Sequence, residues 1–329
     1  MRFDNNIIKK ILFLSVFTLL FPRPSFSAGG ESLSFLSMNP SPISAAMAEA
    51  TVARVGESQS VFSNPAGLAH TVSREVSVLH TTHLDDMTAQ SLSYTSPTPK
   101  GGWGAAVSYM SIGGIAHTEF DPSATGTGST RYVESGEVDA GDQMLSLSWG
   151  QRLTYNMAWG ASVKVAQEVL DDESAVCVLG DAGVVYRVDH QWRVGGLIRN
   201  VGTPVKFISE SSPSPTEVRA AVYCKSRNWF QWELDGYLRP SSDPGGSFGV
   251  EMSWRKNAFL RAGYVYRSED PDLGAATGVT AGVGFRLGLL GMDYAFIPLG
   301  DLGISHRISM GWRFGGETPS SSAARRPTI

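Results

Sequence analysis

The stretch Arg307-Ile308-Ser309-Met310-Gly311-Trp312-Arg313-Phe314 determines the predicted fold of this chain. Side chains alternate across a β-strand, so every second residue of the stretch lies on the same face. Ile308, Met310, Trp312 and Phe314 therefore form an apolar face, opposite a polar and basic face. The same period of two recurs upstream, behind an apolar N-terminal leader. This combination predicts an all-β fold, a membrane-spanning antiparallel β-barrel.

Residues 1–28 have the pattern of a secretory signal peptide. Three basic residues precede an apolar run from Ile11 to Phe21, and small side chains lead to a cleavage site before Ala28. A helix that crosses a bilayer needs about 20 apolar residues, and this run is shorter. We therefore expect export and cleavage rather than a membrane anchor.

The composition also favours a barrel over a bundle of spanning helices. No later segment is apolar over the length of a spanning helix, and the mean hydropathy is −0.07. Polar side chains that face a barrel lumen dilute the lipid-facing ones, so a value near zero is typical of barrels. The net charge of −4 argues against a general nucleic-acid binder. A disulfide between Cys177 and Cys224 is an open alternative, but two unpaired small apolar residues are the favoured interpretation.

The periodicity and the intervening turn residues predict an up-and-down barrel of about fourteen strands. The connections are short after even-numbered strands and mostly long after odd-numbered ones, which is typical of short periplasmic turns and long outer loops. The longest predicted loops are 113–141, 165–179 and 202–215. The predicted strands are 74–81, 87–96, 102–112, 142–151, 156–166, 180–188, 191–201, 216–225, 229–239, 246–255, 258–267, 277–287, 289–297 and 304–314.

The eight tryptophans all map to the short-turn end of the predicted strands, and only Trp229 has the parity of the lumen. Tryptophan gathers at membrane–water interfaces because its ring is apolar while its N–H group needs a polar partner. The other seven are therefore predicted to form an aromatic girdle: Trp103, Trp149, Trp159, Trp192, Trp232, Trp254 and Trp312.

Two motifs resemble those of a known family. Asn64-Pro65-Ala66-Gly67-Leu68-Ala69 precedes the first predicted strand, and Asp293-Tyr294-Ala295-Phe296-Ile297-Pro298-Leu299-Gly300-Asp301-Leu302-Gly303 precedes the last one. With them the chain resembles the FadL-like outer-membrane proteins, particularly the PorV/PorQ (UPF0164-type) branch. The resemblance implies a fourteen-stranded barrel whose N-terminal segment folds back into the lumen as a hatch.

The resemblance also implies a division of the chain. Residues 29–73 would form the N-terminal luminal hatch and residues 74–314 the transmembrane barrel. Residues 315–329 depart from the family: they have no strand pattern and are expected to form a disordered tail, whereas barrels of this kind commonly end on the terminal aromatic residue. Asn64, Pro65, Ala66 and Gly67 would form the tight motif of the hatch, because proline restricts φ and the asparagine side chain can bond nearby backbone. An ordinary turn ahead of the first strand is the alternative.

Members of this family pass hydrophobic compounds through a lateral opening at a kinked third strand. Gly113 and Gly114 follow the third predicted strand, where paired glycines can interrupt strand pairing. A plain strand end explains them equally well. The apolar residues of the predicted hatch are candidate contacts for a hydrophobic ligand: Phe35, Leu36, Met38, Met47 and Phe62.

The expected function is therefore uptake of hydrophobic small molecules, such as long-chain fatty acids, by a monomer in outer-membrane lipid that the barrel-assembly machinery inserts. The alternative is a PorV-like barrel component of protein secretion that binds exported cargo. We expect no enzyme, no metal and no cofactor, because no nucleophile motif is present and His80 and His83 fall on opposite faces of a strand. Inward-facing charges of both signs are expected to pair with one another and with the hatch.

Overall fold

The computed structural model describes residues 33–83, 87–113, 116–120, 132–137, 140–171, 173–207, 210–240, 242–255, 257–267 and 277–315. The predicted signal peptide, Gly114 and the predicted tail beyond Gly315 lie outside these residues.

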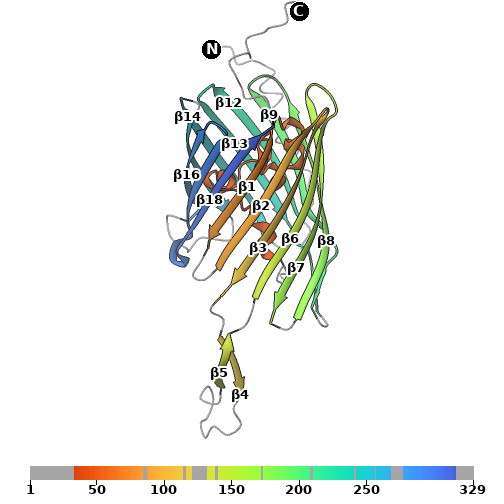
Figure 1. The fold of residues 1–329 in the computed structure, drawn as a ribbon, viewed down its shortest axis with the longest axis vertical. Helices are drawn as coiled ribbons and strands as arrows, with labels where there is room; N and C mark the ends of the chain where they lie inside the picture. The colour runs from red at the N-terminus through yellow and green to blue at the C-terminus, as the bar shows by residue number, and fades with distance from the viewer. Residues whose placement is uncertain are drawn as a thin grey trace, which may run out of the picture.

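The described chain forms one closed antiparallel barrel of fourteen strands, with neighbours in chain order (Figure 1). The last strand pairs with the first, so that Trp312 lies opposite Val76 and Met310 opposite Val78. This closure confirms the predicted fold. The strands of the barrel are β1 (Arg74–Thr82), β2 (Met87–Thr98), β3 (Gly101–Ile112), β6 (Ala140–Arg152), β7 (Met157–Leu170), β8 (Glu173–Arg187), β9 (Trp192–Gly202), β12 (Glu217–Arg227), β13 (Phe230–Arg239), β14 (Ser242–Trp254), β15 (Ala258–Arg267), β16 (Val279–Leu287), β17 (Leu290–Pro298) and β18 (Ile304–Phe314).

All fourteen predicted strands are present, but one predicted long loop is wrong. Within 165–179, β7 continues to Leu170 and β8 begins at Glu173, and Glu168 pairs with Ala175 across the two strands. A charged residue such as Glu168 is typical of a loop. In the structure, however, its carboxylate lies inside the barrel and accepts a hydrogen bond from Leu33 N–H. Similarly, β14 begins at Ser242 and shortens the loop expected before residue 246.

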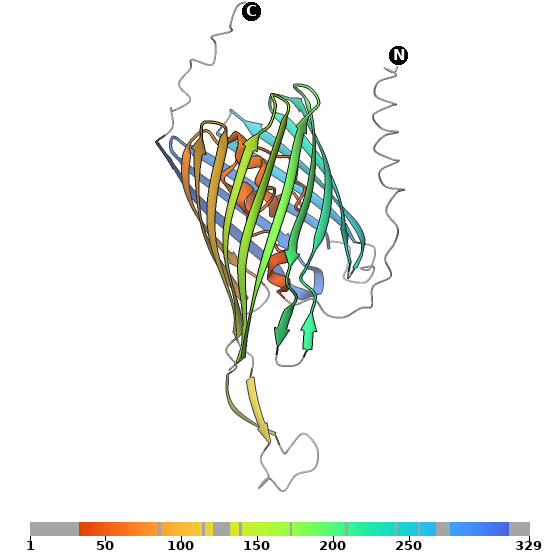
Figure 2. The ribbon, with the colours of Figure 1, turned by 90° about the vertical axis from the view of Figure 1, so that its right-hand side faces the viewer.

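Two predicted outer loops contain short hairpins that sequence periodicity missed. Strands β4 (Ala116–Phe120) and β5 (Tyr132–Glu137) pair within the loop after β3, and β10 (Val205–Phe207) pairs with β11 (Glu210–Ser212) in the loop after β9. Figures 1 and 2 show the β4–β5 hairpin projecting beyond one end of the barrel. We call this end the long-loop end, and the opposite end, where β3 begins and β18 ends, the short-turn end.

The outer surface of the barrel is apolar along the strands. On β18, Ile308, Met310 and Trp312 are 46%, 53% and 57% exposed, while Arg307 and Ser309 between them are buried. This alternation confirms the two faces expected from the sequence of this strand. Among the described residues, no helix is long and apolar enough to cross a membrane. Cys177 and Cys224 are buried and free, as the favoured interpretation expects.

The predicted girdle residues lie near the short turns. Trp103 of β3 is opposite Trp149 of β6, and Trp149 packs edge-on against Trp159 with ring centroids 5.2 Å apart. Trp192 and Trp232 form a similar pair at 5.5 Å. Edge-on contacts of this kind are favourable for aromatic rings. Their role at a membrane interface stays a prediction.

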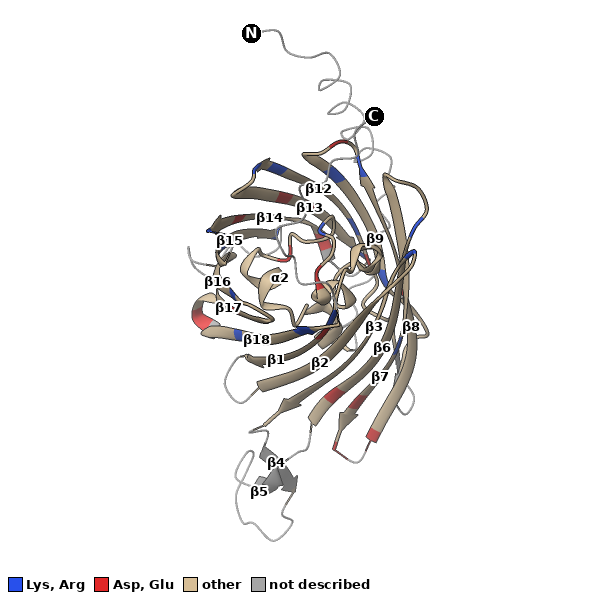
Figure 3. Ribbon diagram, turned by 45° about the horizontal axis from the view of Figure 1, so that its top comes forward, with Lys and Arg blue, Asp and Glu red and all other residues tan. Residues whose placement is uncertain are grey.

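Residues 33–73, which we call the luminal segment, lie inside the barrel (Figures 2 and 3). Helix α2 packs against β16 and β17, and η3 packs against β6 and β7. Ser41 caps α2 by accepting a hydrogen bond from Ser44 N–H at 3.1 Å, and a proline follows at the first helical position. The short helices of the segment are η1 (Ser34–Ser37), α2 (Pro42–Ala46), η2 (Ser58–Val61) and η3 (Pro65–His70); a further 3₁₀ turn, η5 (Gly300–Leu302), precedes β18.

The lipid-facing surface can be tested with two leucines of nearly equal exposure. Leu147, midway along β6, is 58% exposed, and Leu153, in the turn after β6, is 56% exposed. We expect Leu147→Arg to lower the free energy of unfolding in lipid vesicles by about 2–4 kcal/mol, because it places a charge in hydrocarbon. Leu153→Arg is the control and should change it little. Equal effects of the two variants in denaturant titrations would contradict a membrane around β6.

Candidate functional site

The middle of the luminal segment is fastened to the wall by two carboxylates of β13. Ala53 N–H donates to Glu233 at 2.5 Å, and Thr51 N–H and Val52 N–H donate to Asp235 at 3.2 Å and 3.3 Å. Buried backbone donors need partners, and this bend of the chain has no strand ladder to supply them. Glu233 and Asp235 are two residues apart and share the inward face of their strand, so their side chains meet this need together.

Buried ion pairs add to this fastening. Arg54 of the luminal segment pairs with Glu251 of β14 at 3.1 Å, and Glu49 pairs with Arg219 of β12 at 2.8 Å. Glu251 also pairs with Arg261 at 2.6 Å. These contacts confirm the expected pairing of inward charges across strands and with the N-terminal segment. Because a buried charge left without its partner is costly, they hold the middle of the segment in one position.

The alternation of the predicted strand 246–255 places Arg255 among the inward-facing charges, and this prediction is wrong. Arg255 is exposed in the turn after β14, where its φ is +48°. The strand ends at Trp254, so the alternation that would carry Arg255 into the lumen stops one residue earlier.

The Asn64 motif lies against β7 and β8. Asn64 caps η3 by accepting a hydrogen bond from Ala66 N–H at 3.0 Å, and its amide nitrogen donates to the Val52 carbonyl at 2.7 Å. These are the local backbone contacts expected of an asparagine in a lumen. The wall leaves space only because it has glycine here: a Cβ on Gly183 would lie 1.9 Å from Asn64 Oδ1. The motif therefore determines how closely the segment approaches the wall.

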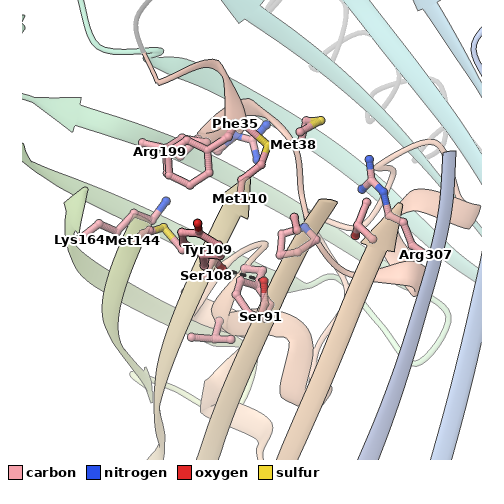
Figure 4. Close-up of a pocket in the computed structure, with 16 residues that line it drawn as sticks. Phe35, Met38, Ser91, Ser108, Tyr109, Met110, Met144, Lys164, Arg199 and Arg307 are labelled. Carbon is pink, nitrogen blue, oxygen red and sulfur yellow. Dashed lines mark hydrogen bonds between the residues drawn. The ribbon is translucent and has the colours of Figure 1, made fainter. Parts of the chain in front are cut away.

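A cavity of about 50 Å³ lies between the luminal segment and the wall, on the long-loop side of the Asn64 motif (Figure 4). Helices η1 and η2 contribute one side of it, and β2, β3 and β6 the other. Ser91 and Ser108 bond to each other at 2.8 Å along this wall. Its apolar lining includes Phe35, Leu36, Met38, Val61, Phe62, Met110 and Met144.

Four of the five predicted ligand contacts line this cavity: Phe35, Leu36, Met38 and Phe62. Met47 does not. It is fully buried elsewhere, against Gly249 and Gly263, and its sulfur accepts a hydrogen bond from Arg54 at 3.2 Å. Composition identified these residues as apolar, but the direction of each side chain in an irregular segment depends on the wall.

Sequence reasoning missed the contribution of the wall to the cavity. Met110 on β3 and Met144 on β6 are buried in it, and Lys164 on β7 and Arg199 on β9 also line it. Their inward parity was readable from the strand pattern. Parity, however, gives only the face of the sheet, and it says nothing of the depth along the lumen.

Three cations reach this cavity, and they differ in their partners. Lys164 pairs with Asp181 at 2.7 Å, and Arg199 pairs with Glu217 at 3.0 Å. Arg307 donates instead to the main-chain carbonyl of Asn39, and its Nε has no partner among the described residues. Arg307 is therefore the cation of this cavity that forms no ion pair with another described residue.

The third barrel strand shows no interruption. Every residue of β3 from Gly101 to Ile112 is paired with both β2 and β6, and Gly113 follows directly after the strand. The described residues thus fit a plain strand end. The lateral opening at Gly113 and Gly114 stays a prediction, since Gly114 lies outside the described residues.

The contact between Asn64 and the wall can be tested with two glycines. We expect Gly183→Ala to destabilise the protein by about 1–3 kcal/mol, as overpacking does, because its Cβ meets the Asn64 side chain. Gly236→Ala on β13 is the control, since nothing lies within 4 Å of its added Cβ. Thermal unfolding followed by circular dichroism measures both. Equal melting temperatures for the two variants would contradict the close packing of the motif.

Solved structures with the same fold include a monoaromatic hydrocarbon channel, a toluene transporter and a FadL homologue. The CymD monoaromatic hydrocarbon channel has a TM-score of 0.61 at 12% identity, covering 87% of this chain and 99% of its own. The toluene transporter TbuX of Ralstonia pickettii has a TM-score of 0.60 at 14% identity, and the match covers 83% of this chain and 98% of TbuX. A FadL homologue of Pseudomonas aeruginosa has a TM-score of 0.53 at 10% identity, and the match covers 83% of this chain and 98% of the homologue. These identities are low, so the likeness shows the fold alone.

Among curated proteins, none matches this sequence significantly. The sequence model of an uncharacterised protein family, UPF0164, matches residues 46–267, from the luminal segment to the end of β15. The matched part is more than half of the 329-residue chain. The chain therefore has a FadL-like barrel fold and belongs to the UPF0164 family.

Proposed function

We propose that this protein is a bacterial outer-membrane transporter that takes up hydrophobic small molecules. The observation that carries the proposal is the apolar cavity between the luminal segment and the wall, inside a closed barrel with an apolar outer surface. The structural neighbours described as hydrocarbon channels and toluene transporters support it. In this proposal the protein is a monomer, and its seven outward tryptophans form the girdle at the periplasmic interface.

The luminal segment acts as the hatch of this transporter. Pockets for small ligands usually have volumes of about 300–1,000 Å³, so a cavity of about 50 Å³ corresponds to a closed state. Ligand binding then requires residues of the segment to move. The part around η1 is the part that moves, because hydrogen bonds attach it to the wall and none of the ion pairs between described residues does: Leu33 N–H donates to Glu168 at 3.1 Å, and Arg199 donates to the Ser37 carbonyl at 3.2 Å. The part from Glu49 to Arg54 stays in place through its buried ion pairs.

Hydrophobic acids, such as long-chain fatty acids, are the substrates that the cavity suits best. Phe35, Met110 and Met144 offer apolar surface, and methionine adapts to ligands of different shape. Arg307 offers a guanidinium that can bind a carboxylate through two parallel hydrogen bonds. A neutral hydrocarbon would use the apolar surface but not Arg307.

The apolar part of the site can be tested with two methionines. We expect Met110→Gln to weaken binding of toluene and of laurate about tenfold, because its amide enters the cavity without a partner. Met252→Gln on β14 is the control, since Met252 is 40% exposed on the outer surface. Calorimetry on the protein in detergent measures both affinities. Unchanged binding by the Met110 variant would contradict the site, and recovery of secreted proteins with the purified barrel would favour a role in secretion.

The charge preference can be tested at Arg307. We expect Arg307→Gln to weaken laurate binding about tenfold or more, because a charge-assisted hydrogen bond is lost. Toluene binding should change by less than about twofold, because toluene has no carboxylate. Glutamine keeps a donor but is shorter than arginine, so toluene binding also shows whether losing the contact with the Asn39 carbonyl disturbs the cavity itself. Equal losses for the two ligands would contradict a carboxylate at this position.

A further inference from the structure

A second cavity, of about 240 Å³, lies at the short-turn end of the lumen. Val55 and His70 of the luminal segment form one side of it, and the ends of β8, β9 and β12 with the turn after β6 form the other. It shares no lining residue with the cavity at Arg307. Since a water molecule occupies about 30 Å³, there is room for about eight of them.

This second cavity is lined by cations. Arg187 of β8 lies over the ring of Tyr155 at 4.3 Å and donates to the Tyr155 carbonyl at 2.8 Å. Arg193 of β9 lies over the ring of Tyr223 at 3.8 Å, and Lys225 of β12 is exposed beside them. Stacking on a ring holds a guanidinium in place without neutralising its charge.

The charges of these three residues are not offset by ion pairs. None of the ion pairs between described residues includes Arg187, Arg193 or Lys225. One carboxylate lines the cavity, that of Asp189, which accepts hydrogen bonds from Gln191 N–H at 2.7 Å and Trp192 N–H at 2.9 Å. The three cations and the one carboxylate therefore give the cavity a net positive charge.

The positive charge of the cavity acts on His70 of the luminal segment. Burial lowers the pKa of His70, and the nearby cations Arg152, Arg193 and Arg187 lower it further. The positive field thus acts across the cavity and on the segment that fills the lumen. An anion placed between these groups would favour the protonated imidazole and raise the pKa of His70.

We propose that this cavity binds the anionic head group, a carboxylate or a phosphate, of an amphiphile that leaves the lumen at the short-turn end. Guanidinium groups bind both oxyanions through paired hydrogen bonds, and the exposed ring of Tyr155 offers apolar surface to the first carbons of the chain. The direction of movement rests on the proposed function. Binding of the anion does not, because it depends on this cavity alone.

The test follows the imidazole of His70 by nuclear magnetic resonance, using the full chain in phosphatidylcholine nanodiscs and the His70→Gln variant for assignment. The probes are octanoate, octyl phosphate, inorganic phosphate and octanol. We expect octanoate and octyl phosphate to raise the pKa of His70 saturably, and octanol to leave it unchanged. No saturable change with either anionic amphiphile overturns the proposal. Inorganic phosphate binding as tightly as octyl phosphate overturns its amphiphile part, because it would indicate a site for free anions.

The matched variants separate this cavity from the other one. We expect Arg187→Gln combined with Lys225→Gln to weaken octanoate binding at His70 at least about tenfold, the loss expected from charge-assisted hydrogen bonds. Arg255→Gln, an exposed cation of another short turn, should leave it unchanged. Equal effects of the two charge changes would overturn the proposal. Toluene binding, measured in parallel, tests only the proposed function, so either can fail without the other.

Discussion

The structure depends on one constraint: each backbone N–H and C=O group that is shielded from water needs a partner within the protein. The barrel meets it by closing β1 on β18, so that it has no free strand edge. The luminal segment has no such ladder, and the wall supplies side chains instead. Glu233 and Asp235 take the backbone donors of residues 51–53, and Asn64 bonds the carbonyl of Val52. The polar lumen is thus a set of partners for one irregular segment.

This arrangement divides the segment by the strength of its attachment. Its middle is held by buried ion pairs, such as Arg54 with Glu251, while η1 is held by a few hydrogen bonds. The two cavities lie on either side of the firmly held part: the apolar one beside η1 and the cationic one beside His70. A ligand that displaces η1 separates none of these ion pairs, but its apolar part has to replace the buried contacts of Leu33, Phe35 and Leu36.

The strand pattern was predictable because inward-facing residues are polar and outward-facing residues are apolar, so the two kinds alternate along each strand. On β18 the alternation of Arg307 and Ile308 corresponds to the lumen and the exposed outer surface. The same reasoning failed at Glu168, because a polar lumen residue and a loop residue have the same chemistry. Within the candidate site, Phe35 and Phe62 were predictable as apolar residues of a luminal segment. Met47 was not, because its position depends on Gly249 and Gly263, which belong to distant strands.

The sequence by itself determined the barrel and the parity of its strands, because these depend on local alternation and composition; the luminal position of the N-terminal segment was expected only from the resemblance to a known family. The tertiary structure alone decided which charges are paired and which face a cavity. Arg54 and Glu251 are 197 residues apart, and their contact depends on the register of the strands around the whole barrel. For the same reason Lys164 meets Asp181, whereas Arg307, with the same inward parity, keeps its charge for a ligand in the proposed site.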